Sequence, residues 1–297
     1  MTRPHVTSIG SYNVDHYLVV ERLPLPGETV RAVNSYTGHG GKGSNQAVSA
    51  ARLGASSRLV AALGSDPEGS RALEFLASEG VDVSGVSVKP SRTGRAYIVV
   101  SGRQNLIVVD PGANAELSPD DVRRALSSSS DGVLLASLEV PAAAVRVALE
   151  EFRGVRVLNP APASPEATQL LGLADIVTPN EVEALQLTGA GSVAEAASRL
   201  LELVPAVVIT LGERGAVVAQ RGSGRLIEVP APRVREVDVT GAGDAFNAAL
   251  AYAIGCGNDL MAAASFAVRA ASLKVTRRGA LGLRAEELRA AGVEPPC

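Results

Sequence analysis

Residues 132–138 read GVLLASL, and the stretch PAAAVRVALEEF follows at residues 141–152. A run of small and aliphatic residues is typical of a strand buried on both faces, and a proline in the first turn is typical of a helix start. The alternation continues, with strands expected at 155–159, 174–179 and 206–211 and helices at 165–172, 180–188 and 192–203. Strands and helices that alternate in this way indicate right-handed βαβ units and a parallel sheet.

The same pattern extends toward the N-terminus. A strand is expected at residues 6–9, another at 57–63 (SRLVAAL) followed by a helix at 67–78, and a further helix begins at SPDD, residues 118–121. Apolar residues make up 46% of the 297 residues but aromatic residues only 3%, which suits a core of Ala, Val and Leu between a sheet and its helices. We therefore expect one α/β domain over residues 1–297.

Two stretches interrupt the alternation. Residues 29–36 (TVRAVNSY), and residues 95–101 with 105–109, are typical of exposed antiparallel strands and lack crossover helices. We expect them to form a small separate sheet, within about residues 12–38 and 92–110, that covers a site as a lid. Residues 127–130 (SSSS) are expected to form a short loop.

Charge and cysteine content exclude several classes of protein. The 28 basic and 31 acidic residues give a net charge of −3 without a basic stripe, so nucleic acid is not an expected partner. Cys256 and Cys297 are too few for a disulfide framework or a four-cysteine zinc site, and we expect a small buried side chain and a terminal thiol. The N-terminus lacks the apolar core of a signal peptide, and no apolar run approaches a membrane span, so a cytoplasmic protein without membrane contact is expected.

Polar residues gather where the expected strands end. Ligands of open α/β sheets bind outside the carboxyl ends of the strands. Helix capping or turn formation would explain Asn159 or Asn180 singly, but explains the whole set less well. The set comprises Glu139, Asn159, Asn180, Glu183, Thr210 and Gly212.

The segment DVTGAGD at residues 238–244 precedes the helical stretch AFNAALAYAIG. Glycines before a helix leave N–H groups free for an anion, and the helix dipole adds positive potential. A carboxylate would repel a phosphate, so we expect Asp244 to take the proton of an attacking hydroxyl while the amides of Gly241, Ala242 and Gly243 stabilise the transferring group. An ordinary acidic first turn of a helix is the alternative.

A second glycine-rich segment, GHGGKGSNQ, occupies residues 38–46. It matches the dinucleotide pattern G-x-G-x-x-G, but a polar stretch precedes it, and it is not a Walker A loop because Gly43 follows Lys42. Lys42 and Asn45 remain available to hydrogen-bond a small polyol. Asn13 and Asp15 are two apart in an extended segment and therefore project to the same side, where they could bind adjacent sugar hydroxyls, although a plain turn is the alternative.

Asn180 and Glu183 are three residues apart at a helix start, so they share a face. A carboxylate beside a phosphate site usually acts through Mg²⁺ and its waters. A capped helix with an acidic first turn is the competing interpretation.

Taken together, these segments resemble the ribokinase branch of the PfkB carbohydrate kinase family from residue 10 to residue 279. The two signatures are GGKGSNQAVSAARLG at 40–54 and DVTGAGDAFNAAL at 238–250, and LEVP, NPAPA, TPNE, TLGERG and VTRRGA fall in the family's order. The resemblance implies a ribokinase-like, doubly wound and mostly parallel sheet flanked by helices, and a β lid that often pairs with the lid of a second subunit, giving a homodimer.

The resemblance also implies the ligands and the residues that hold them. It assigns the sugar to Asn13, Asp15, Gly41, Lys42, Asn45, Glu139 and Asp244. It assigns ATP to Asn180, Thr210, Gly212, Gly215, Gly241 and Gly243, beside the Mg²⁺ candidate Glu183. It places a monovalent cation, usually potassium, near Asp238, Thr240, Lys274, Arg277 and Gly279, several of them through backbone carbonyls.

Four residues depart from the usual family pattern. Leu283 stands where a hydroxyl is usual near the cation, His39 replaces an apolar residue, and Arg95 and Tyr97 on the lid are bulky and polar. If Arg95 and Tyr97 face the sugar, the substrate could differ from ribose.

The leading hypothesis is ATP-dependent phosphorylation of the primary hydroxyl of D-ribose to ribose 5-phosphate. The alternatives are a fructokinase, a deoxyribokinase or a nucleoside kinase of the same family, a nicotinamide-dependent oxidoreductase, and a non-catalytic sugar or nucleotide sensor.

Overall fold

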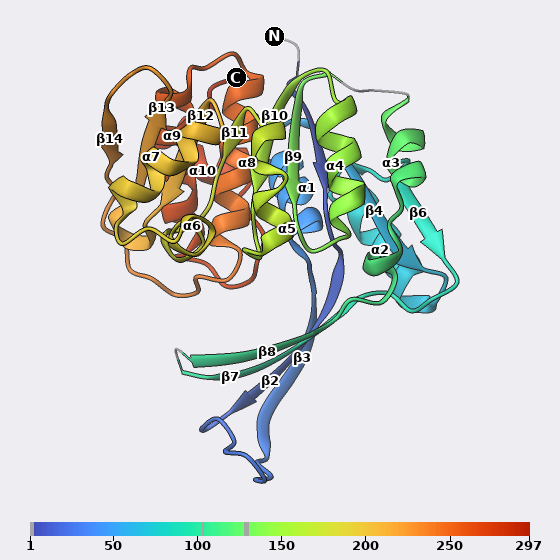
Figure 1. The fold of residues 1–297 in the computed structure, drawn as a ribbon. Helices are drawn as coiled ribbons and strands as arrows, with labels where there is room; N and C mark the ends of the chain where they lie inside the picture. Colours follow the sequence, from blue (N-terminus) through green and yellow to red (C-terminus); the bar gives the residue numbers. More distant parts are fainter. Residues whose placement is uncertain (1–2, 103, 128–130) are drawn as a thin grey trace.

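The computed structural model describes residues 3–102, 104–127 and 131–297, which form an α/β body with a small sheet projecting from one end (Figure 1). The central sheet consists of β1 (His5–Ile9), β4 (Ser56–Gly64), β5 (Val81–Asp82), β6 (Val86–Lys89), β9 (Val133–Ser137), β10 (Val155–Asn159), β11 (Ile176–Val177), β12 (Ala206–Thr210), β13 (Ala216–Gln220) and β14 (Leu226–Val229). Its strand order is β14-β13-β12-β11-β10-β9-β1-β4-β5, with β6 also paired to β4. All pairs are parallel except β12–β13 and β13–β14, which confirms the expected mostly parallel sheet.

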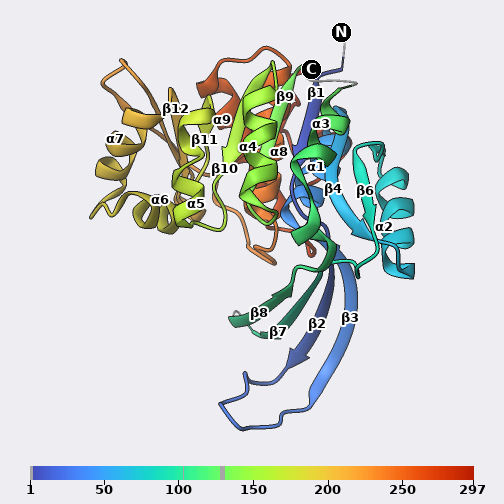
Figure 2. The ribbon, with the colours of Figure 1, turned by 45° about the vertical axis from the view of Figure 1, so that its right-hand side comes forward.

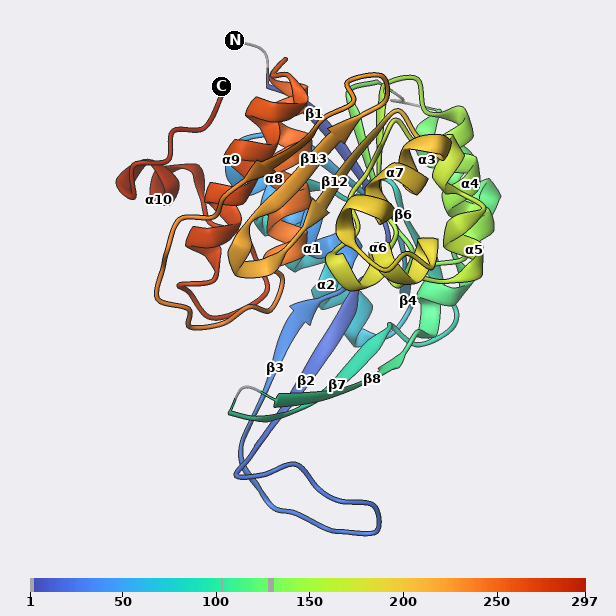
Figure 3. The same ribbon diagram turned by 60° about the vertical axis from the view of Figure 1, so that its left-hand side comes forward.

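Helices cover both faces of this sheet (Figure 3). One face carries α3 (Pro119–Leu126), α4 (Ala142–Glu151), α5 (Pro165–Thr168), α6 (Glu181–Thr188) and α7 (Val193–Leu203). The other carries α1 (Lys42–Leu53), α2 (Pro67–Ser78), α8 (Ala242–Gly255), α9 (Leu260–Lys274) and α10 (Ala285–Ala290). In β9, Leu134 packs into the first layer and Leu135 into the second, because successive side chains of a strand point to opposite faces.

The small sheet lies beside the carboxyl end of β1 and extends away from the body (Figure 2). It consists of two antiparallel hairpins, β2 (Asn13–Val20) with β3 (Ala32–Gly40) and β7 (Arg95–Ser101) with β8 (Gln104–Asp110). The hairpins join through β2 and β7, which run parallel, so the sheet is mixed rather than wholly antiparallel.

Several expected elements differ in extent. The helix expected at 165–172 is α5 followed by a 3₁₀ turn at Leu171–Leu173, and the strand expected at 174–179 is only Ile176–Val177. The other 3₁₀ turns are Gly112–Glu116 and Gly212–Arg214. Of the loop expected at 127–130, residues 128–130 lie outside the described residues. Every helix within the described ranges is too short or too polar to cross a bilayer.

The expectation for the two cysteines is wrong. Cys256, which follows α8, forms a disulfide with the terminal residue Cys297. The hydroxyl of Tyr252 donates a 2.7 Å hydrogen bond to the carbonyl of Cys297. The pair brings together residues 41 positions apart, a proximity that composition and spacing did not indicate.

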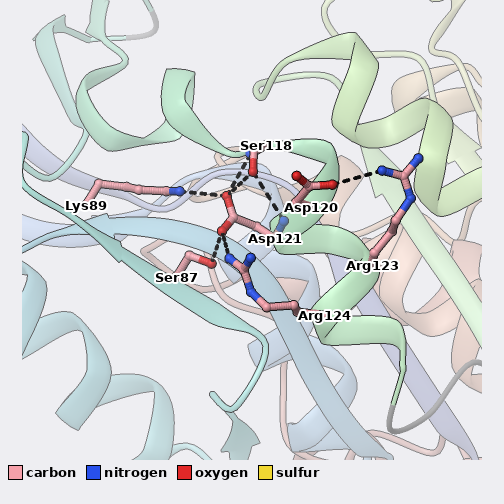
Figure 4. Close-up of polar contacts among 7 residues, drawn as sticks. All are labelled: Ser87, Lys89, Ser118, Asp120, Asp121, Arg123 and Arg124. Atoms are coloured by element: carbon pink, nitrogen blue, oxygen red, sulfur yellow. Dashed lines mark hydrogen bonds and ion pairs between the residues drawn. The ribbon is translucent and has the colours of Figure 1, made fainter.

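A buried carboxylate fixes α3 against the edge of the sheet (Figure 4). Asp121 is 3% exposed and accepts hydrogen bonds from Lys89 Nζ at 2.6 Å and Ser87 Oγ at 2.9 Å. Its side chain also closes a capping box with Ser118, which confirms the expected helix start. Burial alone would raise the pKa of Asp121, but the hydrogen bonds from Lys89 and Ser118 hold that pKa well below its usual range.

The order of the central strands reverses between β1 and β9. From β1 the strands β4 and β5 follow on one side, and from β9 the strands β10, β11 and β12 follow on the other. Ligands of doubly wound sheets bind at such a switch point, outside the carboxyl ends of the strands. A ligand-binding site is therefore expected among the residues that follow β1 and β9.

Candidate active site

Asp244 lies in the first turn of α8, where a tight turn aims the helix at the switch point. Gly241 is the N-cap with φ 72°, and a Cβ there would lie 1.9 Å from the carbonyl oxygen of Ala280, so only glycine fits. Asp244 is 7% exposed, and it accepts hydrogen bonds from Asn45 Nδ2 at 2.9 Å and Gln46 Nε2 at 3.2 Å. Burial raises the pKa of Asp244 to about 6, although Lys42 and Asn45 favour the charged form.

Glu139 connects the residues that follow β9 to those that follow β1. Its carboxylate accepts hydrogen bonds from the Ser11 hydroxyl and, at 3.0 Å, from the backbone N–H of Lys42. The Lys42 ammonium lies 3.8 Å from Glu139 Oε1. Burial alone would lower the pKa of Lys42, but the charges of Asp244, Glu139 and Glu183 raise it, so Lys42 is a cation in the site.

Asn13 and Asp15 stand on one face of β2 and are both buried. Asn114 Nδ2 donates a 2.9 Å hydrogen bond to Asn13 Oδ1, and the Tyr17 hydroxyl donates one of 3.2 Å to Asp15 Oδ2. A Cβ on Gly40 would lie 2.3 Å from the Asp15 carboxylate oxygens, so β3 needs a glycine at that position. Burial raises the pKa of Asp15 to about 6, and the charges of Glu139 and Asp244 act in the same direction.

Arg95 and Tyr97 do not share the face of Asn13 and Asp15. In the parallel β2–β7 pair, Arg95 lies opposite Val14 and Tyr97 opposite His16, so both project from the other face of the sheet. Arg95 instead forms an ion pair of 2.7 Å with Glu68. The two unusual lid residues therefore give no reason to exclude ribose.

Three buried acceptors around Asp244 have no hydrogen-bond partner in the described part of the chain: Asn45 Oδ1, Gln46 Oε1 and Asn247 Oδ1. Asn45 and Gln46 hydrogen-bond Asp244, and Asn247 lines a cavity whose lining also includes Asp244. A buried acceptor without a partner costs free energy. A ligand rich in hydroxyl donors would satisfy them, as a sugar is.

Four of the six residues predicted at the strand ends, Asn159, Asn180, Glu183 and Thr210, line one cavity of about 140 Å³; Glu139 and Gly212 do not line it. Its lining includes Lys42, Asn159, Asn180, Glu183, Thr210, Gly241, Gly243 and Asp244. A larger groove of about 1000 Å³ continues from it, and its lining includes Thr210, Gly212, Gly215, Ala242, Gly243 and Phe246. All six residues assigned to the nucleotide thus line the cavity or the groove, and Asp244 lines the cavity.

The first turn of α8 offers part of the expected anion site. No atom lies within 4 Å of a Cβ placed on Gly243, so the backbone is open to the cavity there. The N–H of Ala242, by contrast, donates to the carbonyl of Val239 at 3.0 Å and is engaged. The amides of Gly241 and Gly243 therefore remain the better candidates for holding a phosphoryl group.

Asn180 and Glu183 form a capping box. Asn180 Oδ1 accepts a 2.8 Å hydrogen bond from the N–H of Glu183, and Glu183 Oε2 accepts one of 2.9 Å from the N–H of Asn180. The capping interpretation is therefore correct, and both residues also line the cavity. Burial raises the pKa of Glu183, with the Asn180 N–H and Lys42 acting in the opposite direction. Across the described residues, no three His, Cys, Asp or Glu side chains cluster as a ready-made metal site.

The residues assigned to a monovalent cation are together but do not fit potassium at two of the expected oxygens. Lys274 Nζ donates to the carbonyl of Asp238 at 3.1 Å and also to the carbonyl of Thr240. The Asp238 carboxylate accepts the N–H groups of Thr240 and Gly279, each at 2.9 Å. The N–H of Arg277 donates to the carbonyl of Lys274 at 2.9 Å.

Sequence reasoning missed Ser11, Gln46, Asn114 and Asn247 as members of the site. Gln46 directly follows Asn45, and Asn247 lies three residues after Asp244 on one helix face, so local spacing could have found both. Asn114 lies 101 positions from Asn13, and no local pattern connects them.

His39, which departs from the usual family pattern, hydrogen-bonds the Tyr12 hydroxyl and stacks on Phe75 with ring centroids 3.6 Å apart.

Fold and site define a carbohydrate kinase: a buried carboxylate and unpartnered acceptors stand at the end of a groove, at the switch point of a doubly wound sheet. The chain belongs to the pfkB family of carbohydrate kinases, whose family model matches residues 3–286. This confirms the resemblance. The glycines of residues 38–43 span the end of β3, a strand of the small sheet, and the start of α1. They do not follow a strand of a βαβ unit, so the dinucleotide alternative lacks its structural context.

Several of the known proteins similar to this chain are named ribokinases, and one, from Salmonella typhi, 35% identical over 287 residues, is named a deoxyribokinase. A ribokinase of Haemophilus influenzae is 39% identical over 290 residues, which cover 94% of each chain. The crystal structure of a ribokinase from Thermotoga maritima matches with a TM-score of 0.88 and 34% identity, covering 97% of this chain and 98% of that one. The structure of an Arabidopsis thaliana ribokinase complexed with ribose and ATP matches with a TM-score of 0.82 and 33% identity, covering 94% and 95% of the two chains.

Proposed function

We propose that this protein transfers the γ-phosphoryl group of ATP to the primary hydroxyl of D-ribose, giving ribose 5-phosphate and ADP. The observation that carries the proposal is the position of Asp244, whose carboxylate is held by Asn45 and Gln46 at the end of the groove. The similar ribokinases favour ribose over the other sugars of the family.

The sugar would lie between β2, α1 and α8. Asn13 and Asp15 would bind hydroxyls from the β2 side, while Gly41, Lys42, Asn45 and Glu139 would bind them from the switch point. Asp244 would then accept the proton of the attacking hydroxyl as the new O–P bond forms and the bond to the ADP oxygen breaks. A pKa near 6 suits this role, because the carboxylate is ionised at neutral pH yet more basic than an exposed one.

ATP would follow the groove, with its base beyond Gly212 and Gly215 and its phosphates near Asn180, Thr210, Gly241 and Gly243. Mg²⁺, bound by the phosphates, would neutralise charge on the transferring group, and Glu183 is the carboxylate placed to orient its waters. Lys42, which lines the same cavity, would add positive charge.

The small sheet would act as a lid and as a dimer surface. Its strand β8 exposes Leu106, Ile107, Val108 and Val109, each between 49% and 67%. A contiguous exposed apolar strand is typical of a surface that meets a partner, and we propose a second copy of this chain. Because ATP is the phosphoryl donor, we further propose that the protein works in the cytoplasm.

A substrate panel tests the proposed function. Wild-type protein with ATP and Mg²⁺ is assayed for ADP release with D-ribose, 2-deoxyribose, D-fructose and ribonucleosides, and ³¹P and ¹H NMR locate the new ester. We expect the highest kcat/KM with ribose and a phosphate on its primary hydroxyl. A higher kcat/KM for another acceptor would reassign the substrate, and binding of sugar and ATP without turnover would indicate a sensor.

A further inference from the structure

We propose that the ammonium group of Lys274 is a built-in substitute for the monovalent cation, so that this kinase does not need potassium. The inference rests on the proposed function, because the turn that Lys274 holds is the one that carries Asp244. It departs from the expectation that potassium binds these carbonyls.

Lys274 is the last residue of α9 and is fully buried, with 0% of its surface exposed. Its Nζ donates to two backbone carbonyls, those of Asp238 and Thr240. A buried cation must find acceptors to offset its lost hydration. Carbonyl oxygens turned toward a common positive charge are also what a bound alkali ion requires, so the two occupants compete for one place.

Potassium and Lys274 cannot both use these oxygens. An ion bonded to the carbonyls of Asp238 and Thr240 would lie against an ammonium that is already at hydrogen-bond distance from both, and the two positive charges would repel. Leu283, where the family pattern has a hydroxyl, packs with the apolar cluster of α8 and α9 and has no side-chain oxygen to offer. The Lys274 ammonium and the missing hydroxyl at Leu283 therefore both disfavour potassium binding.

The Lys274 ammonium lies beside the loop that orients Asp244. Residues 238–240 lead directly into Gly241, the N-cap of α8, and Asp244 follows within the first turn. The Asp238 carboxylate ties the same loop to Gly279 through a 2.9 Å hydrogen bond. A fixed cation that gathers these carbonyls orients the turn permanently, whereas an exchangeable ion would do so only when bound. Lys274 is thus a positioning residue rather than a catalytic one.

The salt dependence of the wild-type protein is the first test. Ribose kinase activity is measured with the Tris salt of ATP and MgCl₂, replacing tetramethylammonium chloride by KCl from 0 to about 100 mM at constant ionic strength. We expect kcat and kcat/KM to change less than twofold. A tenfold or larger rise with KCl would overturn the inference.

Two variants separate a cation substitute from a merely structural lysine. Lys274→Ala opens space beside the carbonyls, so we expect a loss of at least tenfold without potassium and recovery of most of it in KCl. Lys274→Met keeps the bulk but not the charge, so we expect the same loss without recovery. Equal activity of Lys274→Ala in both salts would contradict the proposal.

Crystallography with a potassium analogue tests the inference independently of kinase activity. Crystals of the wild-type protein are soaked in thallium(I) acetate, and anomalous maps are inspected within bonding distance of the Asp238 and Thr240 carbonyl oxygens. We expect no peak in the wild type and a peak in Lys274→Ala. A wild-type peak there would refute the inference even if Lys274→Ala does not fold, and the result stands whichever sugar the enzyme phosphorylates.

Discussion

The side-chain amide of Asn45 donates a 2.9 Å hydrogen bond to the Asp244 carboxylate, although the two residues are 199 positions apart in the chain. Asn45 lies in the first turn of α1 and Asp244 in the first turn of α8, so one contact aligns two helix N-termini on one point. Gln46 adds a second hydrogen bond at 3.2 Å. The carboxylate that we propose as the base is therefore held in place in the unliganded protein, by the same helix that supplies Lys42.

Asp244→Asn should abolish most turnover without unfolding the protein. Removing the base lowers kcat by roughly 10²–10⁴. Because burial raises the pKa of Asp244 from 3.8 to about 6, ionisation is unfavourable in the folded state, and a neutral side chain should leave the protein equally or more stable at pH 8. Steady-state kinetics and thermal unfolding at pH 8 measure the two effects.

The matched control for this variant is Asp120→Asn, at an exposed position whose side chain is 79% accessible. It should retain wild-type kinetics. Near-normal turnover in Asp244→Asn would remove Asp244 from the mechanism, and a large drop in melting temperature would attribute the loss to misfolding.

The acid limb of kcat/KM should report the ionisation of Asp244. The base acts only as a carboxylate, so kcat/KM should fall as the pH decreases through about 6. The charge of Glu139 raises the pKa of Asp244 and that of Lys42 lowers it, so Glu139→Gln should shift the limb to lower pH and Lys42→Met to higher pH. Profiles from pH 4.5 to 9 for the three proteins give the midpoints.

Asp15, whose pKa is also raised to about 6, is a second group that can contribute to this limb. In Asp15→Asn its contribution disappears and only the ionisation of Asp244 remains. A limb that keeps the same midpoint in both Glu139→Gln and Lys42→Met would show that another group controls the rate.

Asp121→Ala should destabilise the protein without affecting its chemistry. Removing one member of a buried ion pair costs about 3 kcal/mol, and the partners left behind are Lys89 and the more exposed Arg124. Because the pKa of Asp121 is held below its usual range, this stabilisation is present at neutral pH and is lost as the pH falls below about 4. Urea unfolding of wild type and variant between pH 2.5 and 7 should show the difference in their free energies of unfolding shrinking below about pH 4.

Its control is Asp120→Ala, the exposed neighbour, which should change the free energy of unfolding by less than about 0.5 kcal/mol. If the difference in free energy of unfolding between wild type and Asp121→Ala stays constant with pH, the ionised Asp121 carboxylate does not stabilise the protein as we propose.

The Cys256–Cys297 disulfide should stabilise the protein only under oxidising conditions. Closing a span of 41 residues restricts the unfolded chain and is worth about 4 kcal/mol in the chain-entropy model. Cys297→Ser should therefore be less stable than the oxidised wild type by up to that amount and equal to the wild type in dithiothreitol. Urea unfolding with and without reductant, together with thiol titration, tests this; an oxidised wild type with two reactive thiols would refute the pairing.

Much of the fold followed from local patterns. The alternation from residue 132 to residue 211 predicted β9, α4, β10 and β12 to within about two residues, because buried strands and capped helices leave compositional marks. The small sheet was recognised by its missing crossover helices, but the parallel β2–β7 pair was not, since pairing between distant strands has no local signal. The split of residues 165–173 into two short turns was missed for the same reason.

Residue types and local patterns were enough to indicate the class of enzyme and the chemistry of its residues: the glycine turn before Asp244, the donors at Lys42 and Asn45, and the polar residues at the strand ends. Which of these groups contact one another became known only from the folded chain. It placed Asn114 on Asn13, joined Cys256 to Cys297, turned Arg95 toward Glu68, and brought the Lys274 ammonium onto two carbonyls. The physical reason is that motifs encode local backbone geometry and side-chain chemistry, whereas burial and contacts between distant segments arise only when sheet and helices pack together.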